Sequence, residues 1–194
     1  MDDKAFAAAK EKLALSRERL AEMKAAEDIV RLNRAWSEFL TEAQRVFTRM
    51  RKATNDGPSK GWFDGILNVR GDDDLLSYIL HARNAEEHGI ERITSARPGG
   101  LKVNIGGDGY VDSMKIEQKA DAVKVTYRGK NPITFEPIAA SVDLIAVLDR
   151  GIMYQPPKTH LGEKLSAVTP IAVAELAQAY LDKIMTEADE KFRK

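Results

Sequence analysis

The fold of the first half of the chain is decided by residues 28–54, DIVRLNRAWSEFLTEAQRVFTRMRKAT. Their apolar side chains recur at steps of three or four residues, which places them on one stripe of a helix. Asp28 is a helix-capping residue type, and the cluster Asn55-Asp56-Gly57-Pro58 ends the stripe. Because residues 1–54 contain neither Gly nor Pro, we expect two helices there, divided near Ala25–Asp28.

Two shorter helices are expected next. Residues 59–70 carry a third apolar cluster that includes Trp62 and Phe63. The run Asp72-Asp73-Asp74 then has the acidic side chains that satisfy free N–H groups at a helix start, in preference to binding Mg²⁺. A fourth helix is therefore predicted from Asp73 to His88, with Gly89 at the position that a helix C-terminus favours.

The pattern changes after Gly89. Residues 92–155 are rich in turn residues and contain alternating runs that predict antiparallel strands, at 101–105, 111–116 and 123–127. Thr169-Pro170 then begins a last helix. We predict an α+β fold that forms a single domain over 1–194. Its helical core comprises 28–90 and 169–194, and a small antiparallel β-sheet is inserted before the C-terminal helix as a β-rich segment, 92–155.

The composition limits the chemistry that this fold can perform. The 194 residues include 30 Lys+Arg, 30 Asp+Glu, 3 His and no Cys. The lack of Cys excludes disulfides, thiolate catalysis and Cys-ligated metals. With no net charge the molecule as a whole attracts neither nucleic acid nor an anionic membrane, so such binding needs a local patch. With no apolar segment of transmembrane length and no apolar leader, we expect a cytoplasmic protein without membrane association.

The fourth helix contains two of the three His residues. His81, Asn84 and His88 fall on one face of it, at i, i+3 and i+7. A helix C-terminus stabilises a protonated imidazole, which suits an acid catalyst that faces phosphate. His160 has no second ligand residue at metal-binding spacing, so no metal role is expected for it.

The segment Arg83-Asn84-Ala85-Glu86-Glu87-His88 resembles the Arg, four to six residues, His motif of the HEPN superfamily, in which a polar residue often follows the Arg. The resemblance covers residues 28–90 and the last helix, and leaves out the β-rich segment. It implies a homodimer that cleaves RNA without a metal or cofactor, as a toxin or defence component with an antitoxin or another protein as partner. Two motif copies would form one active site, where His88 is the general acid/base, Arg83 binds phosphate and Asn84 orients the substrate.

Other observations favour a different interpretation. Arg83 and Glu87 are an i, i+4 pair of a kind common on surface helices. Residues 55–100 contain 5 basic and 8 acidic side chains, whereas phosphate binding needs Lys and Arg. A compact basic run stands at Arg45, Arg49, Arg51 and Lys52, as a candidate RNA-binding surface or the solvated face of an ordinary helix. The alternative function is a non-catalytic HEPN-like module that binds a protein or small ligand.

Overall fold

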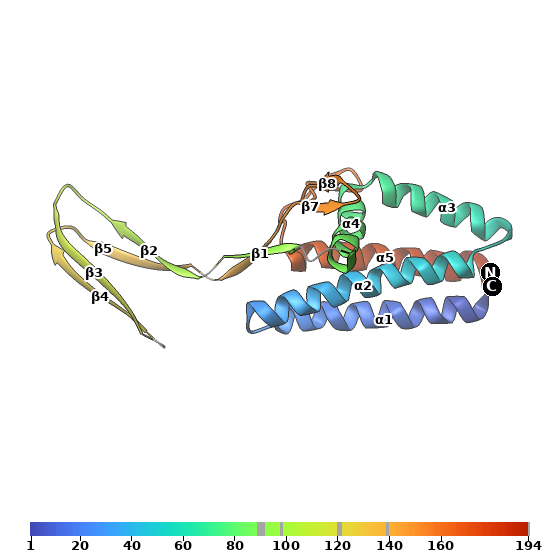
Figure 1. The fold of residues 1–194 in the computed structure, drawn as a ribbon, viewed down its shortest axis with the longest axis horizontal. Helices are drawn as coiled ribbons and strands as arrows, with labels where there is room; N and C mark the ends of the chain where they lie inside the picture. The colour runs from blue at the N-terminus through green and yellow to red at the C-terminus, as the bar shows by residue number, and fades with distance from the viewer. Residues whose placement is uncertain (89–91, 98, 120–121, 139, 194) are drawn as a thin grey trace. The chain divides into compact units, whose positions relative to one another are not determined.

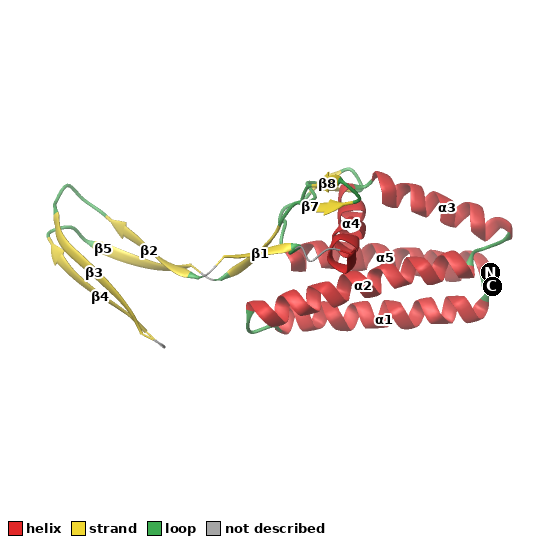
Figure 2. Cartoon of the chain, in the orientation of Figure 1, coloured by secondary structure: helices red, strands yellow, loops and turns green. Residues whose placement is uncertain are grey.

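The protein has a mixed α+β fold in a computed structural model that describes residues 1–194 apart from 89–91, 98, 120–121, 139 and 194 (Figures 1 and 2). The predicted fold class is confirmed at this level. The chain divides into two compact units: Met1–Arg97 together with Val142–Lys194, and Pro98–Ser141. Residues 142–155 thus lie with the helices, because Val142, Leu144 and Val147 are buried there.

Three long helices form the body of the first unit. α1 (Asp3–Ala25) and α2 (Ile29–Ala53) pack together as a hairpin, and α5 (Pro170–Phe192) packs against both (Figure 1). The predicted caps are present: the Asp28 carboxylate accepts from the Arg31 N–H at 2.8 Å, and the Thr169 hydroxyl accepts from the Ala172 N–H at 3.2 Å. The division of the N-terminal region into two helices is therefore confirmed, with its physical cause.

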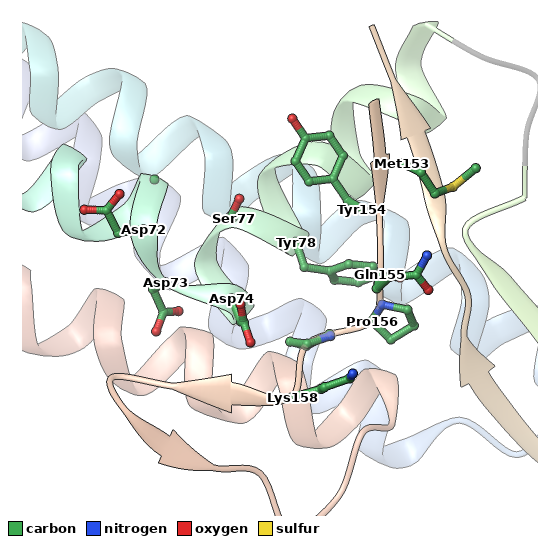
Figure 3. Close-up of a pocket in the computed structure, with 12 residues that line it drawn as sticks. Asp72, Asp73, Asp74, Ser77, Tyr78, Met153, Tyr154, Gln155, Pro156 and Lys158 are labelled. Carbon is green, nitrogen blue, oxygen red and sulfur yellow. The ribbon is translucent and has the colours of Figure 1, made fainter. Parts of the chain in front are cut away.

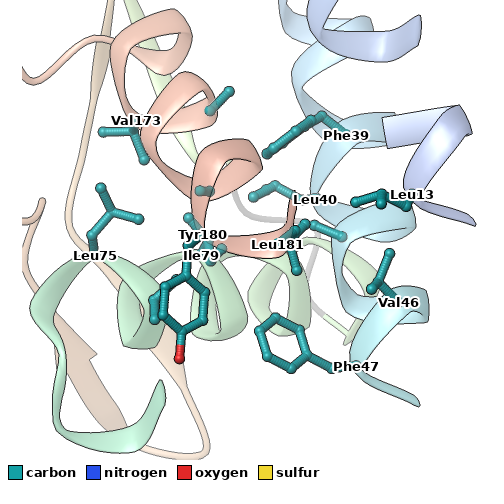
Figure 4. Packing of buried hydrophobic residues seen from close by; sticks show 14 of the residues in the cluster. Leu13, Phe39, Leu40, Val46, Phe47, Leu75, Ile79, Val173, Tyr180 and Leu181 are labelled. Atoms are coloured by element: carbon teal, nitrogen blue, oxygen red, sulfur yellow. The ribbon is translucent and has the colours of Figure 1, made fainter. Parts of the chain in front are cut away.

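The core lies between these helices. Trp36 and Phe39 of α2 stack with ring centroids 6.0 Å apart, and both are fully buried. Leu40 and Leu181, from α2 and α5, fill the same core, as Figure 4 shows. Burying each such side chain contributes about 1.5–3 kcal/mol, so packing between the helices stabilises the unit more than helix propensity does.

Two shorter helices complete the bundle. α3 (Gly57–Asp72) and α4 (Asp74–His88) match the predicted third and fourth helices. α4 contacts α2, α3 and α5, and its apolar side chains Leu75, Leu76 and Ile79 are buried. The expected C-terminal glycine, Gly89, lies outside the described residues.

Two tight hairpins pack on α4. β7 (Val147–Asp149) pairs with β8 (Ile152–Tyr154), and β9 (Thr159–His160) pairs with β10 (Glu163–Lys164). Each hairpin has a two-residue turn, Arg150-Gly151 or Leu161-Gly162, in which both residues have positive φ. Positive φ at both positions is the type I′ geometry that suits the twist of paired strands, and glycine adopts it without a steric penalty.

A third strand pair belongs mostly to the helical unit. In it β1 (Thr94–Arg97) is paired with β6 (Ser141–Leu144). The Thr94 hydroxyl donates to the Asn33 side-chain oxygen at 2.8 Å, which attaches β1 to α2. The two chain segments that lead to and from residues 98–141 are therefore neighbours.

The second unit consists of two-stranded ribbons. β2 (Gly100–Ile105) pairs with β5 (Ile133–Ile138), and β3 (Val111–Lys119) pairs with β4 (Ala122–Gly129). Five of the pairs directly across the ribbons are apolar, namely Leu101↔Pro137, Val103↔Phe135, Ile105↔Ile133, Met114↔Tyr127 and Ile116↔Val125. Opposed residues in antiparallel strands share a face, so each ribbon has one apolar face, yet no described side chain in 98–141 is buried.

Candidate functional site

A carboxylate from β7 holds the candidate face of α4. Asp149 Oδ2 accepts hydrogen bonds from His81 Nδ1 at 2.8 Å and from Asn84 Nδ2 at 3.0 Å. Strand alternation explains this placement, since Val147 and Asp149 are both buried while Leu148 between them is exposed. Tyr154 of β8 stacks on the His81 ring, with centroids 3.5 Å apart and planes 10° apart. The β7–β8 hairpin therefore fixes the two side chains that were predicted to share a helix face.

The charge of Asp149 matters because its side chain is only 6% exposed. Burial, the largest single effect, raises the pKa of this carboxyl, but the hydrogen bonds from His81 and Asn84 and the nearby charges, including that of Arg150, together lower the pKa below its usual range. Asp149 is thus ionised at neutral pH, so it is the acceptor in its contact with His81 Nδ1. The site combines an oriented imidazole and an oriented amide around one anion.

Arg83 lies beside this group but faces other partners. Its guanidinium forms an ion pair with Glu87, one turn later on α4, and donates to Asn84 Oδ1 at 3.4 Å. Its Nε is buried and has no hydrogen-bond partner among the described residues. The structure therefore brings Arg83 and Asn84 together, with part of the Arg83 charge neutralised by Glu87.

The third residue of the motif, His88, is the last residue of α4. Its side chain is outside the described part of the structure, so only its backbone position is known. That position is one helical turn beyond Asn84 and directly after Glu87. Of the three predicted catalytic residues, the structure therefore describes the side chains of Arg83 and Asn84 but not that of His88.

The start of α4 is held by a second His–Asp pair. The Asp73 carboxylate caps the helix by accepting from the Leu76 N–H at 2.8 Å, as predicted for this acidic run. It also accepts from the Leu161 N–H at 2.6 Å and lies 3.0 Å from His160 Nδ1. Burial raises the pKa of Asp73, but the lowering effects, chiefly these three hydrogen bonds, outweigh burial, and the pKa lies below its usual range. Both hairpins thus use a histidine–aspartate contact to fix α4.

A cleft of about 390 Å³ lies between these two contacts. Figure 3 shows Asp73 and Asp74 on one side of it and Gln155, Pro156 and Lys158 on the other. Its lining is mainly acidic at the helix start, which does not suit a phosphate. Among the residues that the structure describes, no group of three or more His, Asp or Glu side chains is arranged to hold a metal ion.

The candidate RNA-binding residues on α2 do not form one surface. Arg45, Arg49 and Lys52 follow one exposed helix face, and Arg45 forms an ion pair with Glu42. Arg51 lies about 120° around the helix from Arg45 and lines a separate hollow with Arg70. Arg45, Arg49 and Lys52 thus form one row along the helix, and Arg51 belongs to a different site.

Sequence reasoning missed the residues that organise α4. Asp149 has a turn-like context, followed by Arg150-Gly151, and its partners are 65 and 68 residues away. The partner of His160 is 87 residues away. No local spacing in the sequence indicates such contacts. The one usable signal was an acidic residue at a strand position that faces the interior. The buried Arg70 was also missed, since its helix carries an otherwise ordinary pattern.

Along the described helices, none is long and apolar enough to cross a membrane. Comparison of the chain with protein-family models, curated protein sequences and solved structures gives no match.

Proposed function

We propose that the protein is a HEPN-like, metal-independent endoribonuclease that acts as a homodimer with a composite active site. The observation that supports it best is the end of α4, where Asp149 orients Asn84 beside Arg83 and one turn before His88. Catalytic side chains need this kind of fixed orientation. The role as a toxin or defence component follows from the motif resemblance alone.

The proposed reaction uses the ribose next to the scissile phosphate. The 2′-oxygen attacks phosphorus and loses its proton, while the bond from phosphorus to the 5′-oxygen breaks and that oxygen gains a proton. His88 transfers one of these protons, because imidazole titrates near neutral pH. Arg83 binds the phosphate oxygens, and its interaction is strongest where negative charge accumulates. The products are a 2′,3′-cyclic phosphate and a 5′-hydroxyl.

The surface beside the motif supports a dimer. Leu148 and Met153 pair across the β7–β8 hairpin, on the face opposite Val147 and Asp149, and they are 41% and 55% exposed. Ile152 in the same hairpin is 57% exposed. Exposed apolar side chains grouped beside a candidate site are typical of interfaces. A second copy docked on this hairpin would bring two motifs into proximity.

An RNA-cleavage assay tests the proposal. Single-stranded RNA is incubated in EDTA with the wild type, Arg83→Ala and His88→Ala, and with Arg17→Ala as a matched arginine control on α1. Wild type and control should cut the RNA at equal rates, and each motif variant should be slower by about 100-fold or more. Identical RNA profiles for the wild type and both motif variants would refute nuclease activity.

A second candidate is the non-catalytic HEPN-like interaction or ligand-binding module. It is favoured by the ion pair of Arg83 with Glu87 and by the bond from Asn84 to Asp149, since both side chains already have partners within the chain. In that case the motif stabilises the end of α4. The cysteine-free chain allows a cross-linking test, in which Met153→Cys should form a disulfide-linked dimer, whereas Val30→Cys, at an exposed position of α2, should not. A dimer without RNA cleavage would support the module, and no Met153→Cys dimer would argue against a two-fold axis close to Met153.

A further inference from the structure

Arg70 of α3 is a buried cation beside a hollow between α2, α3 and α4. Its side chain is 6% exposed, and the hollow has a volume of about 360 Å³. One guanidinium nitrogen, Nη2, donates to Gln44 Oε1, and Cζ lies 4.0 Å from the centroid of the Phe47 ring. Nε is buried without a hydrogen-bond partner in the described residues. Neither the amide nor the ring neutralises the charge, so Arg70 is only partly satisfied.

A second arginine faces the same hollow. Arg51 of α2 lines it with Arg70, and the lining includes no Asp or Glu. Among the described ion pairs, neither arginine has a carboxylate partner within 4.0 Å. Burial, and then the nearby charge of Arg51, lower the pKa of Arg70 to about 10, so the guanidinium stays charged at neutral pH. Arg70 is thus a buried cation without a carboxylate partner, which destabilises the empty protein, and the exposed Arg51 adds a second positive charge at the same hollow.

Apart from Gln44, Thr48 and Gly71, the remaining wall of the hollow is apolar. Phe47, Leu67 and Leu80 contribute to it, from α2, α3 and α4 respectively. A volume near the lower end of the usual range for ligand sites, about 300–1,000 Å³, admits a small organic molecule. A ligand that suits this site carries a compact double negative charge and an apolar body.

We propose that the hollow binds a phosphate monoester, with the phosphate on Arg51 and Arg70 and the apolar part of the ligand against Phe47, Leu67 and Leu80. A phosphate monoester carries about −1.5 to −2 charges at neutral pH, which matches the two arginines. Its oxygens also fit the planar guanidinium forks of the two arginines. The site is independent of Arg83, Asn84 and His88, so it stands or falls separately from the nuclease proposal.

Binding of inorganic phosphate and of adenosine monophosphate, measured by calorimetry, tests the site. Arg51→Gln removes one cation on an exposed position and should weaken both ligands by about tenfold or more. Arg31→Gln, at an exposed arginine of the same helix that does not line the hollow, should leave both affinities unchanged. Equal weakening by the two variants, or no binding up to about 10 mM ligand, would overturn the proposal.

Arg70 is tested without a substitution, because its burial makes a folding defect a foreseeable result of replacing it. The Nε–H resonance of Arg70 should shift on addition of phosphate and saturate with the calorimetric affinity. Two oligonucleotides, one with a 5′-phosphate and one with a 5′-hydroxyl, distinguish a nucleic-acid end from a free ligand as the source of the monoester. If Arg51→Gln weakens both oligonucleotides equally and neither small ligand moves the Arg70 resonance, the monoester site is refuted and the hollow belongs to a phosphodiester-binding surface.

Discussion

Replacement of Asp149 by alanine tests whether this carboxylate holds α4 in place. The substitution removes the acceptor of two hydrogen bonds, from His81 at 2.8 Å and from Asn84 at 3.0 Å. It leaves two polar donors on the inner face of the β7–β8 hairpin without their partner. We expect the loss of stability to come from the unpaired donors of His81 and Asn84. Lost packing should contribute little, because an aspartate side chain has little apolar surface.

The magnitude follows from the geometry. A hydrogen bond to a charged group contributes about 1.5–3 kcal/mol. The two bonds here share one oxygen, Oδ2, and the side chain of His81 is 21% exposed, so water replaces part of what is lost. We therefore expect the free energy of unfolding to fall by about 2–3 kcal/mol, less than the sum of two independent bonds. For a chain of this size the melting temperature should drop by about 4–12 °C.

Urea unfolding followed by circular dichroism measures this loss. The matched control is Asp143→Ala, which removes an aspartate six residues earlier whose partner, Arg97, is 75% exposed. A surface pair of that kind contributes about 0–1 kcal/mol. If Asp149→Ala costs no more than Asp143→Ala, the carboxylate does not hold α4 and the proposed positioning of Asn84 fails with it.

Three further predictions concern charge and architecture. The free energy of unfolding should fall as pH drops below 3.8, because the folded-state pKa values of Asp73 and Asp149 lie below that ordinary value, lowered by hydrogen bonds that act against burial. Denaturation at several pH values measures this loss. A free energy of unfolding that stays constant or rises toward acid pH would contradict the prediction. Glu87→Gln should release Arg83 and strengthen RNA binding severalfold at low salt while costing about 0.5 kcal/mol or less, and unchanged RNA affinity argues against a phosphate-binding role for Arg83. Replacement of 98–141 by a short glycine–serine linker should move the melting temperature of the helical unit by about 2 °C or less, because no described side chain in that segment is buried. Loss of cooperative unfolding would show instead that the segment is needed for the fold.

Much of the fold could be predicted from local patterns. Helix periodicity, the capping aspartates and the Thr169-Pro170 start depend on residues within one turn of each other, so the helices were predicted closely. The alternating runs likewise predicted β2, β3 and β4. The hairpins β7–β8 and β9–β10 were harder, because two- and three-residue strands contain too little alternation to recognise.

The site could be predicted only in part, for a different reason. The shared face of His81 and Asn84 follows from helix geometry and is confirmed by their common bond to Asp149. The identity of that partner, and of Asp73 as the partner of His160, depends on tertiary packing across many residues. The spacing of Arg83 and Glu87 predicted their ion pair, which the structure contains. A sequence pattern thus located the helix face but not the groups that fix it.

The chemistry of the RNA ends tests the central claim most directly. Wild type and His88→Ala are incubated in EDTA with an RNA and with the same sequence lacking its 2′-hydroxyls, and the products are identified by mass spectrometry. The proposed mechanism predicts 2′,3′-cyclic phosphate and 5′-hydroxyl ends from the RNA with wild type, and no cleavage of the 2′-deoxy substrate or by His88→Ala. Intact RNA with wild type, or 5′-phosphate ends that form only without EDTA, would contradict it.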